Sequence, residues 1–131
     1  MKTLGSAISA VVGGNINKLP EILEASHSDL VAATYELTPL VITRDAIVAV
    51  LTAWRDQSCT SDDAQKWASF VRRGFVAGRS GKPVRSIDIK YDAIDEDLIV
   101  EIIARLDEIG DLVDGYIDDD EVEEMLRVLK P

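Results

Sequence analysis

Apolar residues recur at the spacing of an α-helix in four segments after residue 42. The first segment follows Thr43, a predicted N-cap, and continues to about Arg55. The second follows Thr60, whose surroundings imitate a capping box, and is expected to end at Gly74 or Gly78. Both segments predict amphipathic helices with one apolar face.

Two acidic helices are predicted in the last third of the sequence. The first begins at Asp95 and is expected to end near Gly110, and the second runs from Asp118 to about Leu129. Their first turns are acidic, which suits the positive end of a helix dipole. The chain before residue 43 carries weaker signals for three short helices, at about 7–12, 19–25 and 28–37.

Residues 76–92 depart from the helical period. Two glycines and a proline break any helix there, and Ile87, Ile89 and Tyr91 alternate with charged residues in the two-residue period of a strand. A single short strand is unstable without a partner. We therefore expect an extended, basic connection that crosses the bundle, rather than a sheet.

The predicted fold is all-α, with five to seven helices and this one extended connection. We expect a single domain over residues 1–131, with N-terminal helices in 1–42 and a four-helix core in 43–129. A chain of 131 residues can bury one sizeable core, which must rest on aliphatic residues because only 5% are aromatic. Cys59 is the only cysteine, and no apolar run reaches the ~20 residues of a membrane-spanning helix. These features predict a cytoplasmic protein.

Charge is segregated along the chain. Residues 92–124 contain 15 Asp and Glu against Arg105 alone, whereas residues 72–90 contain six Lys and Arg against Asp88 alone. The net charge of −10 exceeds the magnitude of roughly 2 to 8 that suits a small soluble domain. Such a surface repels nucleic acid and anionic membranes and attracts cationic proteins. We therefore expect a protein partner, and neither nucleic acid nor a membrane.

The sequence contains no recognisable catalytic motif. His27 is the only histidine, in a predicted loop beside two serines, and no nucleophile elbow accompanies it. Cys59 precedes a predicted helix N-terminus, where a thiol can be acidified, but a passive, partly buried thiol is the simpler interpretation. Trp54 and Trp67 lie in apolar helical stripes and are expected in the core. We expect no enzyme activity and no cofactor.

Residues 110–121 imitate a twelve-residue calcium loop. Gly115 and Glu121 stand at the required sixth and twelfth positions, but Gly110 and Leu112 occupy the first and third, which should supply oxygen ligands. A tight turn at Gly115 followed by a capped helix explains the same residues. We expect no metal and keep a calcium-responsive switch as a third hypothesis.

The amphipathic helices and the acidic pair after them form a pattern that we compare with known families. Its segments are Ile42-Thr43, Ala64-Gln65-Lys66-Trp67-Ala68, Asp95-Glu96-Asp97-Leu98 through Arg105-Leu106-Asp107-Glu108-Ile109, and Asp118-Asp119-Asp120-Glu121 through Leu129. The pattern resembles the small helical immunity proteins of the colicin D type and their relatives in contact-dependent inhibition systems. The resemblance covers roughly residues 42–129. It implies a protein that binds a cognate toxin domain, often a nuclease that cuts transfer RNA, and covers the toxin's basic cleft with carboxylates.

The expected partner-binding residues are acidic and lie around the turn between the last two helices. They are Asp107, Glu108, Asp111, Asp114, Asp118, Asp119, Asp120 and Glu121. The runner-up hypothesis is a structural or regulatory module that forms a homo-oligomer, with the basic segment of one chain against the acidic helices of another. Two further roles remain open for the basic segment: contact with the acidic helices of its own molecule, and contact with a second partner.

Overall fold

The computed structural model describes residues 2–35, 37, 39–77, 86–110 and 115–130. Within these residues it contains seven α-helices, one short 3-10 helix and a two-stranded sheet. The elements are α1 (Lys2–Val12), η1 (Ile16–Lys18), α2 (Leu19–Glu24), α3 (His27–Thr34), β1 (Leu40–Ile42), α4 (Arg44–Arg55), α5 (Ser61–Arg73), β2 (Ile89–Tyr91), α6 (Glu96–Asp107) and α7 (Asp119–Leu129). The all-α prediction is confirmed.

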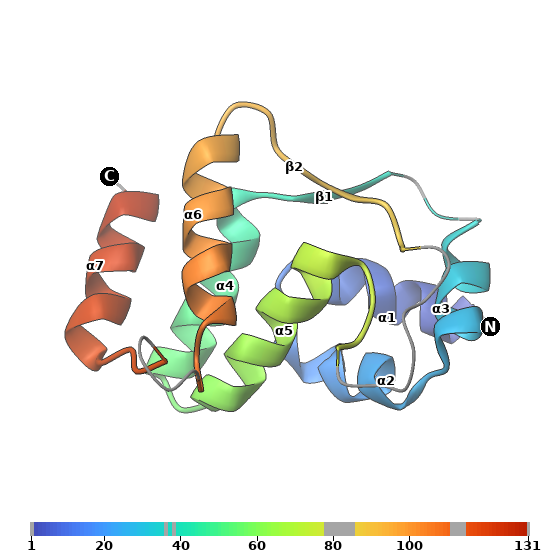
Figure 1. The fold of residues 1–131 in the computed structure, drawn as a ribbon, viewed down its shortest axis with the longest axis horizontal. Helices are drawn as coiled ribbons and strands as arrows, with labels where there is room; N and C mark the ends of the chain where they lie inside the picture. The colour runs from blue at the N-terminus through green and yellow to red at the C-terminus, as the bar shows by residue number, and fades with distance from the viewer. Residues whose placement is uncertain (1, 36, 38, 78–85, 111–114, 131) are drawn as a thin grey trace.

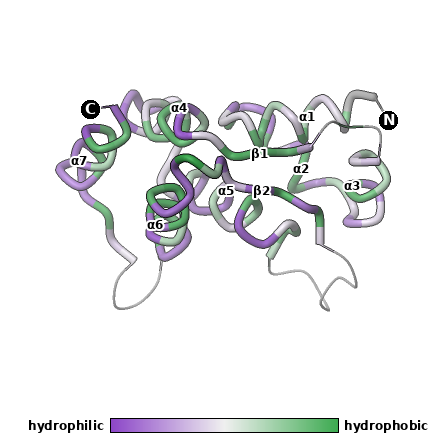
Figure 2. Tube along the Cα trace, turned by 90° about the horizontal axis from the view of Figure 1, so that it is seen from above, coloured by the Kyte–Doolittle hydropathy of each residue, from purple (hydrophilic) through white to green (hydrophobic). Residues whose placement is uncertain are grey.

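The helices are arranged along an elongated molecule, with α7 at one end and α3 at the other (Figure 1). Helix α4 packs against α7, and α5 packs against α6, so the four later helices form one group. Helices α1, α2 and α3 form the second group, in which α1 contacts both of its neighbours. Strands β1 and β2 lie side by side and span the two groups in both views (Figures 1 and 2).

The predicted helix boundaries rest on side-chain caps that the structure contains. Thr43 Oγ1 accepts a hydrogen bond from the Ala46 amide at 3.3 Å and begins α4. A capping box begins α5: Thr60 and Asp63 each accept a bond from the other's backbone amide, at 3.1 and 3.0 Å. Gly74, in the left-handed conformation with φ 78°, ends the same helix. These predictions are confirmed.

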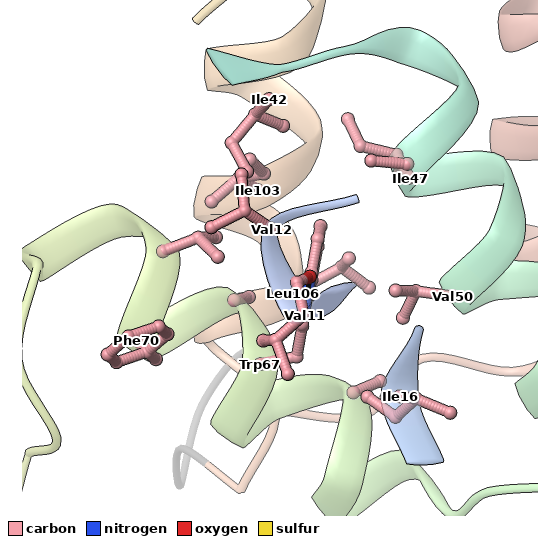
Figure 3. Close-up of a cluster of buried hydrophobic side chains, with 14 of the residues drawn as sticks. Val11, Val12, Ile16, Ile42, Ile47, Val50, Trp67, Phe70, Ile103 and Leu106 are labelled. Carbon is pink, nitrogen blue, oxygen red and sulfur yellow. Dashed lines mark hydrogen bonds between the residues drawn. The ribbon is translucent and has the colours of Figure 1, made fainter. Parts of the chain in front are cut away.

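The buried aliphatic residues of both helix groups belong to one hydrophobic cluster. Trp67 lies in it with no exposed surface, and its indole Nε1 donates a 2.7 Å hydrogen bond to the carbonyl oxygen of Val11. Figure 3 shows Trp67 and Phe70 of α5 with Val11 and Val12 of α1, Ile47 and Val50 of α4, and Ile103 and Leu106 of α6. The prediction that Trp67 lies in the core is confirmed, and Trp67 joins α5 to the N-terminal helices.

Residues 89–91, near the end of the predicted extended segment, form a sheet with residues 40–42. Leu40 pairs with Ile89, and Ile42 with Tyr91, in a parallel two-stranded ladder. The expectation of an unpaired connection was wrong because it assigned no strand to the three residues after Pro39. Leu40 and Ile42 face the core while the residue between them is exposed, so β1 supplies the partner that β2 needs.

The segment before β2 is also tied to the end of α5. The Ile87 amide donates a 2.9 Å hydrogen bond to the Gly74 carbonyl oxygen. A Cβ atom on Gly74 would clash with the Ile87 carbonyl oxygen, so the close approach of the two backbones requires a glycine here. The chain therefore returns from α5 to the sheet along a defined path at these two positions.

Candidate acidic binding surface

Asp107, the last residue of α6, is enclosed by basic residues of the same molecule. Arg72 Nη1 and Arg73 Nη1 lie 2.9 and 2.7 Å from its Oδ2 atom, and Gln65 Nε2 lies 3.1 Å from its Oδ1 atom. Only 4% of the Asp107 side chain is exposed. This predicted site residue therefore holds α5 to α6. Two residues of the basic segment contact an acidic helix of their own molecule, which was one of the roles left open.

Arg105 forms ion pairs with two further predicted site residues. Its guanidinium bonds both carboxylate oxygens of Glu121, at 2.6 and 3.0 Å, and one oxygen of Glu108 at 2.9 Å. It also donates to the Tyr116 carbonyl oxygen at 2.9 Å. The hydrogen bonds that Arg105 donates to Glu121 raise the pKa of its guanidinium above the usual range, and the bond that it donates to Glu108 adds to the effect. Arg105 thus joins α6 to the first turn of α7.

The first turn of α7 presents the carboxylates that remain. Asp118 is its N-cap, and its Oδ1 atom accepts a 2.8 Å hydrogen bond from the Glu121 amide. Asp119 and Asp120 are exposed, and within the described part of the chain neither has an ion-pair partner. The helix dipole favours all three charges at this position. The predicted residues Asp111 and Asp114 lie outside the described residues.

Other exposed acidic residues lie outside the predicted set, on α7 and on α6. Glu123 and Glu124 lie on α7, and Glu96, Asp97 and Glu101 lie on α6. Arg127 binds Glu124, while Arg55 Nη1 stays 3.7 Å from Glu123 Oε1. These residues belong to the acidic stretch at 92–124, so the sequence did indicate them. The predicted site included only the acidic residues around the turn between the last two helices.

Two neighbouring hollows lie beside the first turn of α7. The first, here called the Trp54 groove, has a volume of about 490 Å³ and is lined by Trp54, Arg55 and Thr60 on one side and Asp119, Val122 and Glu123 on the other. It opens between the end of α4 and the start of α7.

The second hollow has a volume of about 480 Å³ and shares Trp54 and Asp119 with the first. Tyr116, whose residue surface is 81% exposed, also lines it. Trp54 is only partly buried, against the core, so the expectation that it lies within the core is corrected. Sequence reasoning missed Trp54 as a site residue, because only the packing of α4 against α7 brings it beside the acidic turn.

Cys59 also lines the Trp54 groove, but its thiol is not activated. Burial, with a smaller contribution from Asp63, raises its pKa to about 11. The alternative of an acidified thiol is therefore wrong, because a raised pKa keeps the thiol protonated and poorly nucleophilic near neutral pH. His27 begins α3 and does not lie in a loop, which corrects its predicted position.

The calcium-like loop is described only in part. The Gly110 amide donates a 3.0 Å hydrogen bond to the Gly115 carbonyl oxygen, and residues 111–114 between them lie outside the described residues. Across the described ranges, no three His, Cys, Asp or Glu side chains form a group that could hold a metal ion.

In those same ranges, none of the helices has the length and apolar character needed to cross a membrane. Comparison of the chain with known proteins found no matching family model, no matching curated protein and no matching solved structure.

Proposed function

We propose that this protein is an immunity protein, which binds a basic nuclease toxin and covers its active-site cleft with carboxylates. The observation that carries the proposal is the first turn of α7, where Asp119 and Asp120 are exposed without an ion-pair partner among the described residues. A net charge of −10 surrounds this turn with a negative field. A cleft that binds phosphates presents the complementary charge.

The predicted site residues divide into two roles under this proposal. Asp118, Asp119 and Asp120 contact the partner, because their carboxylates lie at the exposed start of a helix. Glu108 and Glu121 position that turn through their bonds to Arg105. Asp107 stabilises the packing of α5 on α6 and is withdrawn from the contact surface. Asp111 and Asp114 remain sequence-based members of the site.

Charge would then govern both the speed and the orientation of binding. Opposite fields raise association rates by about 10- to 1,000-fold at low salt. Charge-assisted hydrogen bonds from toxin Arg and Lys side chains to Asp119 and Asp120 would fix the orientation. An inhibitor of this kind protects its own cell from within, so we propose a cytoplasmic location, which suits the free thiol of Cys59.

We expect the gene for this protein to lie beside a gene for a secreted toxin, and the test is inhibition of the nuclease domain of that toxin. Cleavage of transfer RNA by that purified domain is measured on gels at increasing concentrations of this protein. We expect complete inhibition at one equivalent and an affinity that falls steeply with added salt. The variant D118N/D119N/D120N keeps a good N-cap and is expected to bind about 10- to 1,000-fold more weakly, which corresponds to a loss of ~1.4 to 4 kcal/mol of binding free energy.

The matched control is E96Q/D97N/E101Q, which removes the same number of charges from exposed positions on α6. Its inhibition constant should stay within about threefold of that of the wild type, because exposed charges outside the contact contribute little to binding. Equal losses in the two variants would show that net charge alone matters and that the α7 turn is not the site. No inhibition by the wild-type protein would overturn the proposed function.

A further inference from the structure

We propose that the Trp54 groove receives an arginine side chain of the partner protein, whose guanidinium stacks on Trp54 and bonds Asp119 and Glu123. This inference rests on the proposed function, because it specifies which cationic group the acidic surface takes. It goes further by assigning the groove to arginine rather than to lysine. The inference rests on three features of the groove: its shape, the aromatic ring of Trp54, and the carboxylates of Asp119 and Glu123.

The groove combines the two chemical features that distinguish a guanidinium site. Trp54 supplies aromatic surface on the α4 side. Asp119 and Glu123 are four residues apart on α7, so their carboxylates lie on the same face of the helix and both line the groove. A planar guanidinium stacks on an indole and donates several hydrogen bonds in its own plane, whereas an ammonium is a compact, strongly hydrated charge.

An arginine of the protein itself already approaches one of these carboxylates. Arg55 also lines the groove, and its Nη1 atom lies 3.7 Å from Glu123 Oε1. This distance is longer than a hydrogen bond, and 42% of the Arg55 side chain is exposed. A partner arginine that enters the groove can therefore take the bond to Glu123 while Arg55 stays paired with its neighbour Asp56 at 3.5 Å.

The second hollow continues the groove past Trp54 and Asp119 towards Tyr116. A basic segment with several arginines therefore finds a second aromatic residue and the carboxylates of Asp118 and Asp120 next to the first site. The occupant that fits this pair of hollows is an arginine-rich surface segment of a protein. An apolar peptide would cover the carboxylates of Asp119 and Asp120 without offering them a hydrogen-bond donor.

Hexaarginine and hexalysine peptides test the inference because they carry the same charge. Each is titrated into ¹⁵N-labelled protein, and the two indole N–H signals are followed by NMR. Trp67 is fully buried and bonded to Val11, so it is the internal reference. We expect hexaarginine to shift the Trp54 signal and to bind about three- to fivefold more tightly than hexalysine, which is the ratio expected for one exposed cation–π contact.

Two variants separate stacking from charge. Trp54→Leu should abolish the preference for hexaarginine while both peptides still bind. If this variant does not fold, Glu123→Gln decides the question, because Glu123 is exposed and its replacement should reduce hexaarginine affinity more than hexalysine affinity. Glu101→Gln on the exposed face of α6 is the matched control and should leave the preference unchanged.

The outcomes distinguish this inference from the function on which it rests. Equal binding of both peptides, with no shift of the Trp54 signal, would overturn the arginine site and leave charge-driven toxin inhibition intact. Failure to inhibit the toxin domain, together with a preserved preference for hexaarginine at Trp54, would overturn the immunity function and leave the groove as an arginine-binding site.

Discussion

Arg73 Nη1 donates a 2.7 Å hydrogen bond to Asp107 Oδ2, across 34 positions of sequence. Arg72 bonds the same oxygen at 2.9 Å. The basic end of α5 and the acidic end of α6 therefore neutralise part of each other's charge within one molecule. The exposed carboxylates of the first turn of α7 take no part in these contacts.

Replacing Asp107 tests its structural role. Asp107→Asn leaves two arginines beside a neutral amide, and we expect the free energy of unfolding to fall by about 1 to 3 kcal/mol, less than for a fully buried pair because both arginines are partly exposed. Urea denaturation followed by circular dichroism measures the change. Glu101→Gln on the same helix should change stability by less than about 0.5 kcal/mol. A loss equal to that of the control would show that Asp107 does not stabilise the packing of α5 on α6.

Alanine substitutions at Gly74 and Gly110 distinguish the cost of backbone strain from the cost of a steric clash. Both have a left-handed φ, of 78° and 92°. A Cβ atom at Gly74 would meet the Ile87 carbonyl oxygen, whereas at Gly110 it would meet no atom of the described residues within 4 Å. We expect Gly110→Ala to cost about 1 to 2 kcal/mol from conformation alone. Gly74→Ala should cost more, because α5 must also separate from the segment before β2. Thermal unfolding compares the two, and equal losses would argue against the close approach at Gly74.

The Cys59 thiol should react slowly in the folded protein. Its pKa is raised from 9.0 to about 11, chiefly by burial, so the thiolate is scarce at pH 8. We expect the rate of alkylation by iodoacetamide, measured by mass spectrometry, to rise tenfold per pH unit from pH 7.5 to 10 without a plateau. Asp63→Asn should speed alkylation at every pH while keeping an acceptor for the capping box. A plateau near pH 9 would contradict the shift.

The same shift predicts the sign of one pH effect on stability. Below about pH 9 the thiol is neutral in both the folded and the unfolded chain, and it contributes no pH dependence. Between about pH 9 and 11 the unfolded chain loses this proton first. The contribution of Cys59 therefore lowers the free energy of unfolding as pH rises through that range. Cys59→Ser should reduce this part of the alkaline loss of stability.

Substitutions of Asp118 distinguish the effect of its N-cap hydrogen bond on stability from the effect of its negative charge. Its Oδ1 atom accepts the Glu121 amide hydrogen bond that begins α7. Asp118→Ala should lower the free energy of unfolding by about 1 kcal/mol, because the cap is lost. Asp118→Asn keeps an N-cap of similar quality and should stay within about 0.5 kcal/mol of the wild type in urea denaturation. Equal destabilisation by the two substitutions would show that the negative charge, and not the cap, stabilises α7.

The helices after Thr43 were predictable because their signals are local. A cap, an apolar period of 3.6 and a terminal glycine all lie within one segment, and Thr43, Thr60 and Gly74 act where these signals placed them. The sheet was not predictable in the same way. Leu40 and Ile89 carry no mutual signal in the sequence, and β1 has only three residues.

The candidate site was predictable in composition but not in arrangement. The acidic stretch indicated where the charge lies, yet sequence cannot show that Asp107 faces two arginines while Asp119 faces outward. Trp54 joins the site because α4 and α7 pack together, which is a tertiary contact. Residues that lie far apart in the sequence carry no local signal of such a contact. The helical period shows only which face of its own helix each residue occupies.

The pairing of β1 with β2 sets an order for events on the ribosome. Translation at roughly 5 to 20 residues per second delivers β2 several seconds after β1. Until then Leu40 and Ile42 lack their strand neighbour, and a nascent strand without a neighbour can join another chain. The three-residue length of β1 limits that hazard. The early half of the protein thus depends on the later half, and its sheet closes only once Tyr91 has been added.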